Sequence, residues 1–337
     1  MKITNPRCFN QIKLLNHGKY IEKSSNDVEK FINEINWYIN SPALIKQYIP
    51  NIIDYSENKK LPWIKYETIS GKTIHQTLFS LATNMDYEAI CLAYKKFFLV
   101  CNSIKPKNLD VKYWKKNLIK FYLDKTISRI KEISNLDHLS FFFKDNFITI
   151  NKNKYPSVKT IIKYLIDQKK KLEKSTKNNK PNKIAWICTP TKDRICFCHG
   201  DVVFSNVFAF FDRATLKVID PRGSFGDDKK YGDIYYDYAK IYQCLYGYYD
   251  YIIEDKFRYK ITNKHLEYKI YTTQRIFDLQ DVFNEDAFIK KTAKEIKLIE
   301  SLQFLSMVAL HNDNKDRQII MLATGVQHFC DIIKLWK

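Results

Sequence analysis

Residues 10–67 combine strand-like and helical patterns of apolar side chains. Two short alternating runs surround Gly18 in residues 10–24, which predicts a β-hairpin. Apolar side chains then recur at three- and four-residue steps through residues 26–40, and Asn26 or Asp27 can cap the helix that this spacing predicts. Two more short strands, with a turn at residues 57–60, are expected in residues 49–74. The pattern therefore predicts a small lobe of mostly antiparallel sheet with one helix.

Beyond residue 73 the apolar spacing is mainly helical. Residues 86–104 and 110–133 fit helices, and residues 134–167 allow a short hairpin before another helix. Residues 168–183 contain seven lysines and almost no apolar side chains, so we expect a solvated loop there, with a phosphate-binding arm as the alternative. After a strand-rich stretch, four helical segments are expected before Lys337.

Polar residues interrupt the apolar runs between residues 195 and 220. Asp201 follows the first run, and a hairpin predicted for residues 207–219 brings Asp220 back beside Asn206. Two carboxylates and an amide at one sheet edge form a hard-oxygen set that suits Mg²⁺, whereas zinc would require cysteine or more histidine. Each aspartate taken alone could instead be a turn former or a helix cap.

The composition argues against several classes of protein but does not identify a function. The net charge is +19, but only 8 of the 56 basic residues are arginine, so the charge supports nucleic acid as a partner only weakly. No signal peptide or membrane-length apolar run is present, and we expect a cytoplasmic protein that does not bind membranes. The eight cysteines are scattered, and Cys196 and Cys198 are interpreted as reduced core thiols.

The segments "HGDVVFSNVF", "VIDPRG" and "GDIYYDYAKIY" match a known arrangement of residues. An aspartate is followed five residues later by an asparagine and then by a further aspartate, as in kinases. Lacking the arginine of the protein-kinase catalytic loop, this form closely resembles the aminoglycoside phosphotransferase and choline kinase family. The resemblance covers about 45 residues. It implies an α+β, two-lobed protein-kinase-like fold with a small β lobe and a large helical lobe.

The resemblance assigns roles to residues in all parts of the chain. It implies that Asp201 is catalytic and that Asn206 and Asp220 hold Mg²⁺. It also implies that a strand lysine, paired with a helix glutamate, binds the phosphates of ATP; Lys23 and Glu34 occupy these places, with Lys19 as the runner-up for the lysine. Backbone groups of a hinge are expected to bind adenine, and three residues are assigned to it: Glu67, Thr68 and Ile69.

Further residues are expected to support the loop or to contact the substrate. His199, Asp233 and Asp237 are interpreted as structural, with Asp237 at the position that braces the catalytic loop. His311 and Asp313 lie between the C-terminal helices, where such enzymes often bind substrate, although a helix-end cap is equally consistent with them. The implied lobes are residues 1–66 and 73–337, joined by a hinge at 67–72, with residues 105–185 as a helical insertion.

Two features depart from the family pattern. Only Gly18 stands between the first strands, where relatives have a longer glycine-containing nucleotide loop, and this allows a protein that binds ATP without catalysis. Arg222 follows the metal aspartate closely, where relatives that act on cations commonly carry an acid. With the charge of +19, Arg222 favours a neutral or anionic acceptor such as a sugar or polyol. A weaker resemblance, to proteins of bacterial surface-polysaccharide loci, indicates the same.

The function expected from the sequence is therefore an ATP- and Mg²⁺-dependent kinase of a small hydroxyl compound. A non-catalytic ATP-binding protein and a choline- or aminoglycoside-type kinase are the main alternatives. A protein kinase is disfavoured because the segment after Asp220 is short, and a polyanion-binding protein is the fourth alternative. "SGKT" at residues 70–73 is not a Walker A motif, because position 66 is tyrosine and not glycine.

Overall fold

The structure, a computed structural model, describes residues 10–80, 82–174, 183–262 and 265–333. The chain divides into two compact units, each made of two segments. The first unit comprises Met1–Lys107 and Asp193–Asp237, and the second comprises Asn108–Lys192 and Tyr238–Lys337. All the residues expected to handle ATP and the metal fall in the first unit, so their geometry can be described within it.

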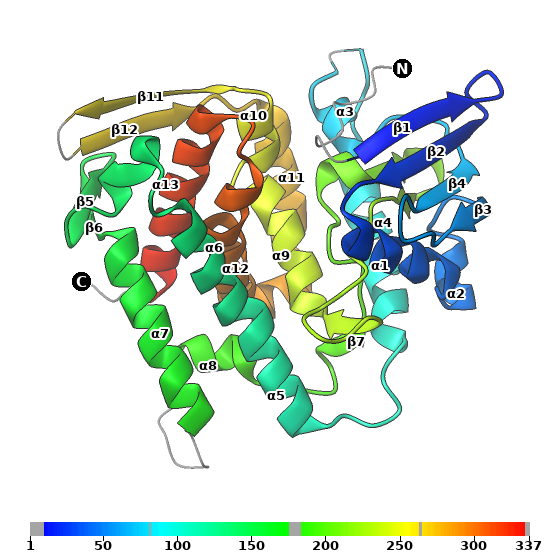
Figure 1. The fold of residues 1–337 in the computed structure, drawn as a ribbon. Helices are drawn as coiled ribbons and strands as arrows, with labels where there is room; N and C mark the ends of the chain where they lie inside the picture. Colours follow the sequence, from blue (N-terminus) through cyan, green and yellow to red (C-terminus); the bar gives the residue numbers. More distant parts are fainter. Residues whose placement is uncertain (1–9, 81, 175–182, 263–264, 334–337) are drawn as a thin grey trace. The chain divides into compact units, whose positions relative to one another are not determined.

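The first unit begins with an antiparallel sheet in the order β1-β2-β4-β3 (Figure 1). Its elements are β1 (Asn10–Leu15), β2 (Tyr20–Ser25), α1 (Val28–Ile39), α2 (Ala43–Lys46), β3 (Ile52–Ser56) and β4 (Trp63–Glu67). The hairpin, the helix after it and the second pair of strands are where the apolar pattern predicted them. The core-facing side of α1 carries buried Phe31, Ile35 and Tyr38, as helical spacing requires.

The rest of the first unit places a small set of strands beside a long helix. Its elements are α3 (Ile74–Leu78), α4 (Tyr87–Ser103), β7 (Ile195–Phe197), β8 (Val207–Phe210), β9 (Thr215–Val218) and β10 (Tyr231–Asp233). β8 and β9 form the predicted hairpin, and β7 pairs with β10. Thr73 and Gln76 form a reciprocal capping box at the start of α3.

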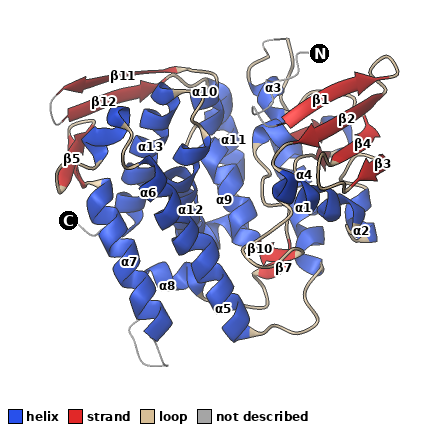
Figure 2. Cartoon of the chain, viewed as in Figure 1, coloured by secondary structure: helices blue, strands red, loops and turns tan. Residues whose placement is uncertain are grey.

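The second unit is mainly helical, with one mixed sheet (Figure 2). Its first segment contains α5 (Val111–Ile119), a π-helical turn η1 (Lys120–Asp124), α6 (Lys125–Ile133), a 3-10 turn η2 (Asp137–Phe142), β5 (Phe147–Ile150), β6 (Asn153–Pro156), α7 (Val158–Lys174) and α8 (Lys183–Cys188). The helix α9 (Ile234–Leu245) begins in the first unit and ends in the second segment of the second unit. That segment then contains α10 (Tyr249–Ile253), β11 (Phe257–Thr262), β12 (His265–Ile270), α11 (Gln274–Asn284), α12 (Ala287–Met307), η5 (Val308–Leu310) and α13 (Lys315–Ile333).

Two predictions for the second unit were wrong in part. Residues 168–174, expected in the lysine-rich loop, form the last turns of α7, because Gln168 and Leu172 continue its buried face; residues 175–182 lie outside the described residues. The segment after residue 256, expected to be wholly helical, contains the β11–β12 hairpin. The alternating sequence "FRYKIT" and "HLEYKI" carries the strand period that was overlooked.

The sheet of the second unit has the order β11-β12-β5-β6, and the β12–β5 pair is parallel. The β5–β6 hairpin had been anticipated from the sequence, but its joining to β11–β12 pairs residues more than a hundred positions apart. Within the described residues, no helix is both long enough and apolar enough to cross a bilayer.

Candidate active site

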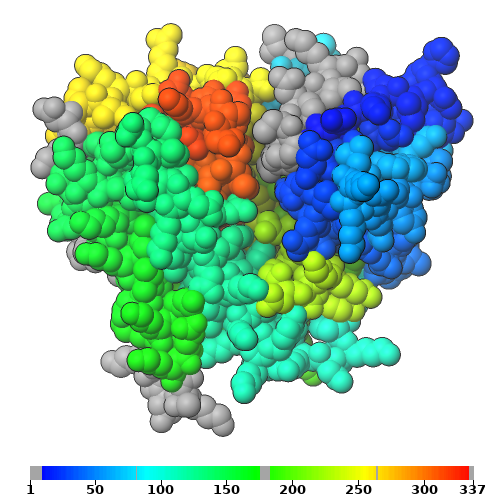
Figure 3. Space-filling model, in the orientation of Figure 1, coloured from blue at the N-terminus to red at the C-terminus, as the bar shows by residue number. Residues whose placement is uncertain are grey.

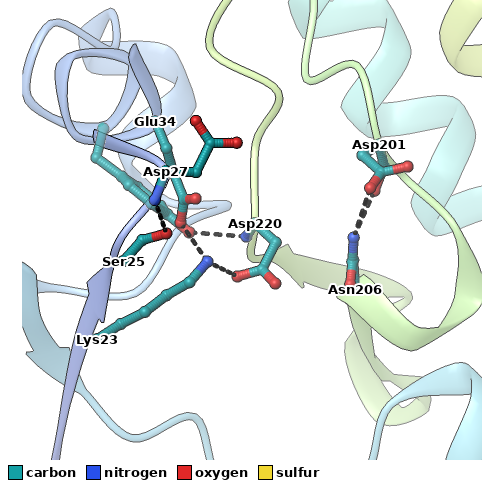
Figure 4. A network of polar contacts seen from close by, with 8 residues as sticks. Lys23, Ser25, Asp27, Glu34, Asp201, Asn206 and Asp220 are labelled. Atoms are coloured by element: carbon teal, nitrogen blue, oxygen red, sulfur yellow. Dashed lines mark hydrogen bonds and ion pairs between the residues drawn. The ribbon is translucent and has the colours of Figure 1, made fainter. Parts of the chain in front are cut away.

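Lys23 is the centre of a buried ionic network in the first unit. Its Nζ lies 2.7 Å from Oε1 of Glu34 and 2.9 Å from Oδ1 of Asp220 (Figure 4). Lys23 comes from β2, which lies between β1 and β4, and Glu34 comes from the side of α1 that faces the sheet. The side chain of Lys23 is only 2% exposed. The structure therefore brings together Lys23, Glu34 and Asp220, which are up to 197 positions apart.

Opposite charges allow Lys23 to remain charged in this buried position. Burial alone lowers the pKa of a lysine, but Asp220 and Glu34 outweigh burial and hold the pKa of Lys23 above its ordinary value. Burial raises the pKa of Glu34 to about 7, and the adjacent ammonium group of Lys23 opposes that rise. Lys19, the runner-up, is exposed and lies 5.3 Å from the centre of the Tyr20 ring, so Lys23 is the lysine that meets Glu34.

The backbone at Asp220 is held in an unusual conformation. Asp220 has φ +59°, and its N–H donates to the hydroxyl oxygen of Tyr38 at 3.0 Å. Two residues later, the N–H of Arg222 donates to the carbonyl oxygen of His199 at 2.9 Å. Gly223 has φ +73°, and a Cβ placed there would lie 2.3 Å from the backbone of Asn33 in α1. Only glycine fits this close approach, which joins the segment after Asp220 to the helix that carries Glu34.

Asp201 and Asn206 form the second part of the site. The side-chain amide of Asn206 donates to the carbonyl oxygen of Asp201 at 3.0 Å and to its Oδ2 at 3.3 Å (Figure 4). The β8–β9 register pairs Val207 with Val218, and the N–H of Ile219 donates to the carbonyl oxygen of Asn206 at 3.0 Å. The hairpin therefore returns the chain so that Asp220 follows a residue bonded to Asn206, as the sequence predicted.

Asn206 and Asp220 keep oxygen atoms that a magnesium ion could use. The nitrogen of the Asn206 amide is engaged by Asp201, and its Oδ1 accepts a long hydrogen bond of 3.4 Å from the Ser205 hydroxyl but retains a second lone pair; Oδ1 of Asp220 is engaged by Lys23. A carboxylate and an amide oxygen suit Mg²⁺, which usually binds one or two carboxylates together with phosphate oxygens and water. Across the described part of the chain, no group of three or more His, Cys, Asp or Glu side chains could hold a metal by itself.

Asp237 supports the backbone that leads to Asp201. Its carboxylate accepts hydrogen bonds from the N–H groups of His199 at 2.9 Å and Gly200 at 2.6 Å. His199 is fully buried, and its Nδ1 accepts from the N–H of Asp201 at 3.2 Å. Burial lowers the pKa of His199 to about 4, so the ring is neutral near pH 7. Through these contacts, Asp237 and His199 hold the backbone of residues 199–201.

Asp233 forms a buried ion pair with Arg194, a partner that was not predicted from the sequence. Asp233 was expected to be structural, and its Oδ1 accepts from Nε of Arg194 at 3.2 Å while its second oxygen contacts the same guanidinium. Arg194 is 4% exposed and also lies over the ring of Tyr235. The pairing of β7 with β10 brings the two residues together. A lone arginine before a short apolar run carries no recognisable signal in the sequence, so only the strand pairing reveals it.

The three residues predicted for the hinge are Glu67, which is the last residue of β4, and the two residues that follow it. The N–H of Glu67 donates to the carbonyl oxygen of Asn51 at 2.9 Å, and that of Thr68 donates to Lys19 at 3.0 Å. Within the residues that the structure describes, no partner is found for the N–H of Ile69. Backbone contacts to a nucleotide base could thus come from Ile69, whereas the N–H groups of Glu67 and Thr68 are already used.

The turn at Gly18, interpreted from the sequence as a shortened nucleotide loop, lies beside the segment predicted to be the hinge. The hydroxyl of Thr68 donates to the carbonyl oxygen of Gly18 at 2.7 Å. The antiparallel register pairs Tyr20 with Glu67 and Lys23 with Ile64, so the turn lies beside the end of β4. Lys23 lies farther along β2 than this turn, and the turn is bonded to the hinge segment.

Three residues predicted to contact substrate are in different surroundings. Nε of Arg222 donates to the carbonyl oxygen of Ser224 at 2.9 Å, and its guanidinium lies 5.8 Å from the centre of the Tyr236 ring. His311 and Asp313 belong to the second unit, where the ring of His311 packs at 5.9 Å from that of Tyr249 and Asp313 pairs with Arg317 at 3.6 Å. Contact of these residues with substrate stays a prediction.

This chain is similar to known proteins in its three-dimensional structure. No protein-family model matches the sequence, and no curated protein matches it either. A thermostable mutant of aminoglycoside phosphotransferase APH(4)-Ia, in ternary complex with AMP-PNP and hygromycin B, matches with a TM-score of 0.56 at 11% identity, covering 99% of this chain and 92% of that chain. A second such mutant complex matches at 0.53, with 10% identity over 99% and 92%.

The ligand-free form of the thermostable enzyme also matches, with a TM-score of 0.51 and 9% identity over 95% of this chain and 88% of that chain. At these identities the likeness concerns the fold, and it extends over nearly all of this chain. The expected fold class is therefore confirmed: the chain has the α+β, protein-kinase-like fold of the aminoglycoside phosphotransferases.

Proposed function

We propose that the protein transfers the γ-phosphoryl group of ATP to a hydroxyl group of a small molecule. The observation that carries this proposal is the buried network in which Lys23 meets Glu34 and Asp220 together. A lysine buried between two carboxylates is costly to build, and it suits a site in which the ammonium group is held ready for phosphate oxygens. The nucleotide-analogue complex of the APH(4)-Ia mutant, on the same fold, gives further support.

Each residue of the site has a role in the proposed reaction. Lys23, oriented by Glu34, binds the α- and β-phosphates, and Asn206 and Asp220 hold the metal. Magnesium, when bound, neutralises charge on the phosphate oxygens. Asp201 accepts the proton of the acceptor hydroxyl or orients it. The bond between the γ-phosphorus and the bridging oxygen breaks, ADP retains that electron pair, and the acceptor oxygen forms the new phosphate ester.

The supporting residues keep this arrangement fixed without taking part in proton transfer. Asp237 holds the backbone of His199 and Gly200, and neutral His199 accepts from the N–H of Asp201. Because proposed catalysis depends on alignment and on charge, the rigidity of this loop is part of its chemistry. In the predicted hinge, the backbone N–H of Ile69 is proposed to contact adenine, because the N–H groups of Glu67 and Thr68 already donate to other residues of the protein.

The acceptor is proposed to be neutral or anionic, such as a sugar, a polyol or a phosphorylated metabolite. The charge of +19 opposes the approach of a polycation, and Arg222 lies two residues after Asp220. A role in surface-polysaccharide synthesis would fit such an acceptor. The alternative acceptors are choline or aminoglycosides, and the matching APH(4)-Ia mutant structure is a ternary complex with AMP-PNP and hygromycin B.

A phosphorylation screen with Mg-ATP across alcohols, sugars and aminoglycosides, read by mass spectrometry, tests this proposal. Asp201→Asn is expected to lower the rate about 100-fold to 10 000-fold while ATP binding stays within twofold. Asp212→Asn, at the β8–β9 turn, is the matched control and should leave the rate unchanged. ATP binding without turnover of any acceptor would favour a non-catalytic protein, and turnover that survives Asp201→Asn would contradict the assigned role.

A further inference from the structure

The sheet of the second unit carries a hollow at its outer surface. The hollow is shallow and open to solvent, and its volume is about 450 Å³. Figure 3 shows the side chains of β11 and β12, in yellow, at the surface of the molecule. Eight residues line the hollow: Asn151, Lys152, Arg258, Tyr259, Lys260, Glu267, Tyr268 and Lys269. None of these residues belongs to the proposed ATP site, so the inference below does not depend on the proposed function.

The shape of the hollow follows from the way the strands end. β5 pairs with β12 only through residues 149–150, and the chain then turns at Asn151 and Lys152, both with positive φ. The side-chain carbonyl of Asn151 accepts from the N–H of Tyr268 at 2.8 Å, which leaves its NH₂ group as a donor at the hollow. β12 continues beyond this point beside β11, so the surface next to residues 267–269 is uncovered by β5.

The inner face of β11–β12 is anchored to α13. The hydroxyl of Tyr259 donates to Asp316 at 2.7 Å, and the hydroxyl of Tyr268 contacts Thr324 at 3.3 Å. Because side chains alternate along a strand, anchoring Tyr259 and Tyr268 inward directs their neighbours outward. Arg258, Lys260 and Lys269 are accordingly exposed. Their positions on paired strands are set by the register of the sheet.

The outward side chains carry excess positive charge. Arg258 and Lys269 stand directly opposite each other across the two strands, an arrangement that repels and costs stability. Lys260 stands opposite Glu267, the one acidic side chain of the lining. In the described parts of the chain, no ion pair or hydrogen bond is found for the side chains of Lys152, Arg258 and Lys260. The lining thus offers four cations and the Asn151 amide against one carboxylate.

We propose that this hollow binds a small molecule that carries phosphate groups and hydroxyl groups, such as a sugar phosphate. Phosphate oxygens would accept from Lys152, Arg258 and Lys269, which relieves the repulsion across the strands. Arg258 can grip a phosphate through two parallel N–H groups. Glu267 can accept from a hydroxyl of the same ligand. A volume near 450 Å³ accommodates such a molecule, whereas a polymer or a lipid surface would need no hollow.

Isothermal titration of the full chain at physiological salt tests this site, with fructose 1,6-bisphosphate and inorganic phosphate as separate soluble probes. The variant Arg258→Gln/Lys269→Gln is expected to weaken binding of the bisphosphate at least about tenfold, because two charge-assisted contacts to phosphate are lost. The control Lys112→Gln/Lys116→Gln removes the same charge from exposed positions of α5 and should change binding less than about twofold.

Several outcomes would overturn the proposal. Equal weakening in both variants would indicate diffuse attraction, and no weakening in either would place binding elsewhere. Failure of both probes to bind at about 10 mM, or binding only to vesicles of anionic phospholipid, would exclude a soluble ligand at the site. If the double variant fails to fold, Lys152→Gln serves in its place, because its side chain lies on a turn; weakening of about threefold or more is then expected, and unchanged binding contradicts the proposal.

Discussion

Positively charged side chains have opposite surroundings at the candidate active site and at the hollow beside β11 and β12. Lys23, in the first unit, is 2% exposed and has two carboxylates within 3 Å, at 2.7 and 2.9 Å. Arg258 and Lys269, in the second unit, are exposed and stand opposite each other on paired strands. The first arrangement is compensated, and the second is repulsive.

The difference follows from the surroundings of the charges. Away from water, an unpaired ammonium group would be expensive, so Lys23 can be charged only because Glu34 and Asp220 are placed beside it. At the surface, water screens the repulsion between Arg258 and Lys269, so the sheet tolerates it. A buried charge therefore requires its partners within the fold, whereas an exposed cluster can wait for a ligand.

Removal of the buried ammonium group is expected to have the largest effect. Lys23→Met leaves Glu34 and Asp220 without their common partner and should lower the free energy of unfolding by about 3–5 kcal/mol. It should also abolish nucleotide binding. Arg194→Met breaks the buried pair with Asp233 and should cost a similar amount, yet retain nucleotide binding in the folded fraction. Urea unfolding and nucleotide titration of both variants check this; unchanged stability of Lys23→Met would contradict it.

Disruption of the close backbone contact between Gly223 and α1 is expected to cause the next largest loss of stability. Gly223→Ala would place a Cβ 2.3 Å from the backbone of Asn33, and we expect a loss of about 3 kcal/mol in unfolding free energy. Gly18→Ala is a matched control, because Gly18 also has positive φ but nothing lies within 4 Å of the added atom. It should lose only about 1 kcal/mol. Equal losses in thermal or urea unfolding would show that the contact with α1 is unimportant.

The contribution of Glu34 to stability is expected to depend on pH. Its pKa is raised to about 7 in the folded protein from an ordinary value of 4.5, so the folded state binds this proton more tightly than the unfolded state. The resulting stabilisation is present below pH 4.5 and is lost as the pH rises to about 7. Over this window the stability of the wild type should therefore fall relative to that of Glu34→Gln. Urea unfolding at a series of pH values measures the difference; a constant difference would refute the raised pKa.

Relief of surface repulsion should have the smallest effect. Arg258→Gln/Lys269→Gln removes a like-charged cross-strand pair and should raise the free energy of unfolding by about 0.2–1 kcal/mol without ligand. The gain should shrink at high salt, because screening already weakens the repulsion in the wild type. Thermal unfolding at low and high salt measures both effects, and a destabilised variant would show that the two side chains attract something within the protein.

Local pattern was sufficient for most elements of the first unit. The hairpin around Gly18, the helix α1 and the β8–β9 hairpin each depend on apolar spacing within about fifteen residues, and each was predicted from it. The β11–β12 hairpin carried the same kind of signal, which was overlooked amid helical segments. The end of α7 was mistaken for a loop because lysines dominate its sequence, although Leu172 keeps its buried face.

In the candidate site, contacts between residues close in sequence were predicted, whereas contacts between residues far apart in sequence were mostly missed. Asp201, Asn206 and Asp220 are near each other in sequence, so a single hairpin was enough to predict that the chain returns to Asn206 just before Asp220. The pairing of Lys23 with Glu34 rested on a resemblance, and the structure supplies the 2.7 Å contact between their side chains. Arg194 and Gly223 were missed as partners of Asp233 and α1, because no spacing rule connects a residue to a partner in another element.

Neighbours along the chain were enough to predict most of the secondary structure of the first unit and to single out Asp201, Asn206 and Asp220 as oxygen donors. Three contacts could be seen only in the folded chain: the bond from Thr68 to the Gly18 turn, the pairing of Lys23 with two carboxylates, and the placement of Arg258 opposite Lys269. The physical reason is that strand register and burial set which charges meet and how strongly they interact, and both depend on chain segments that are distant in sequence.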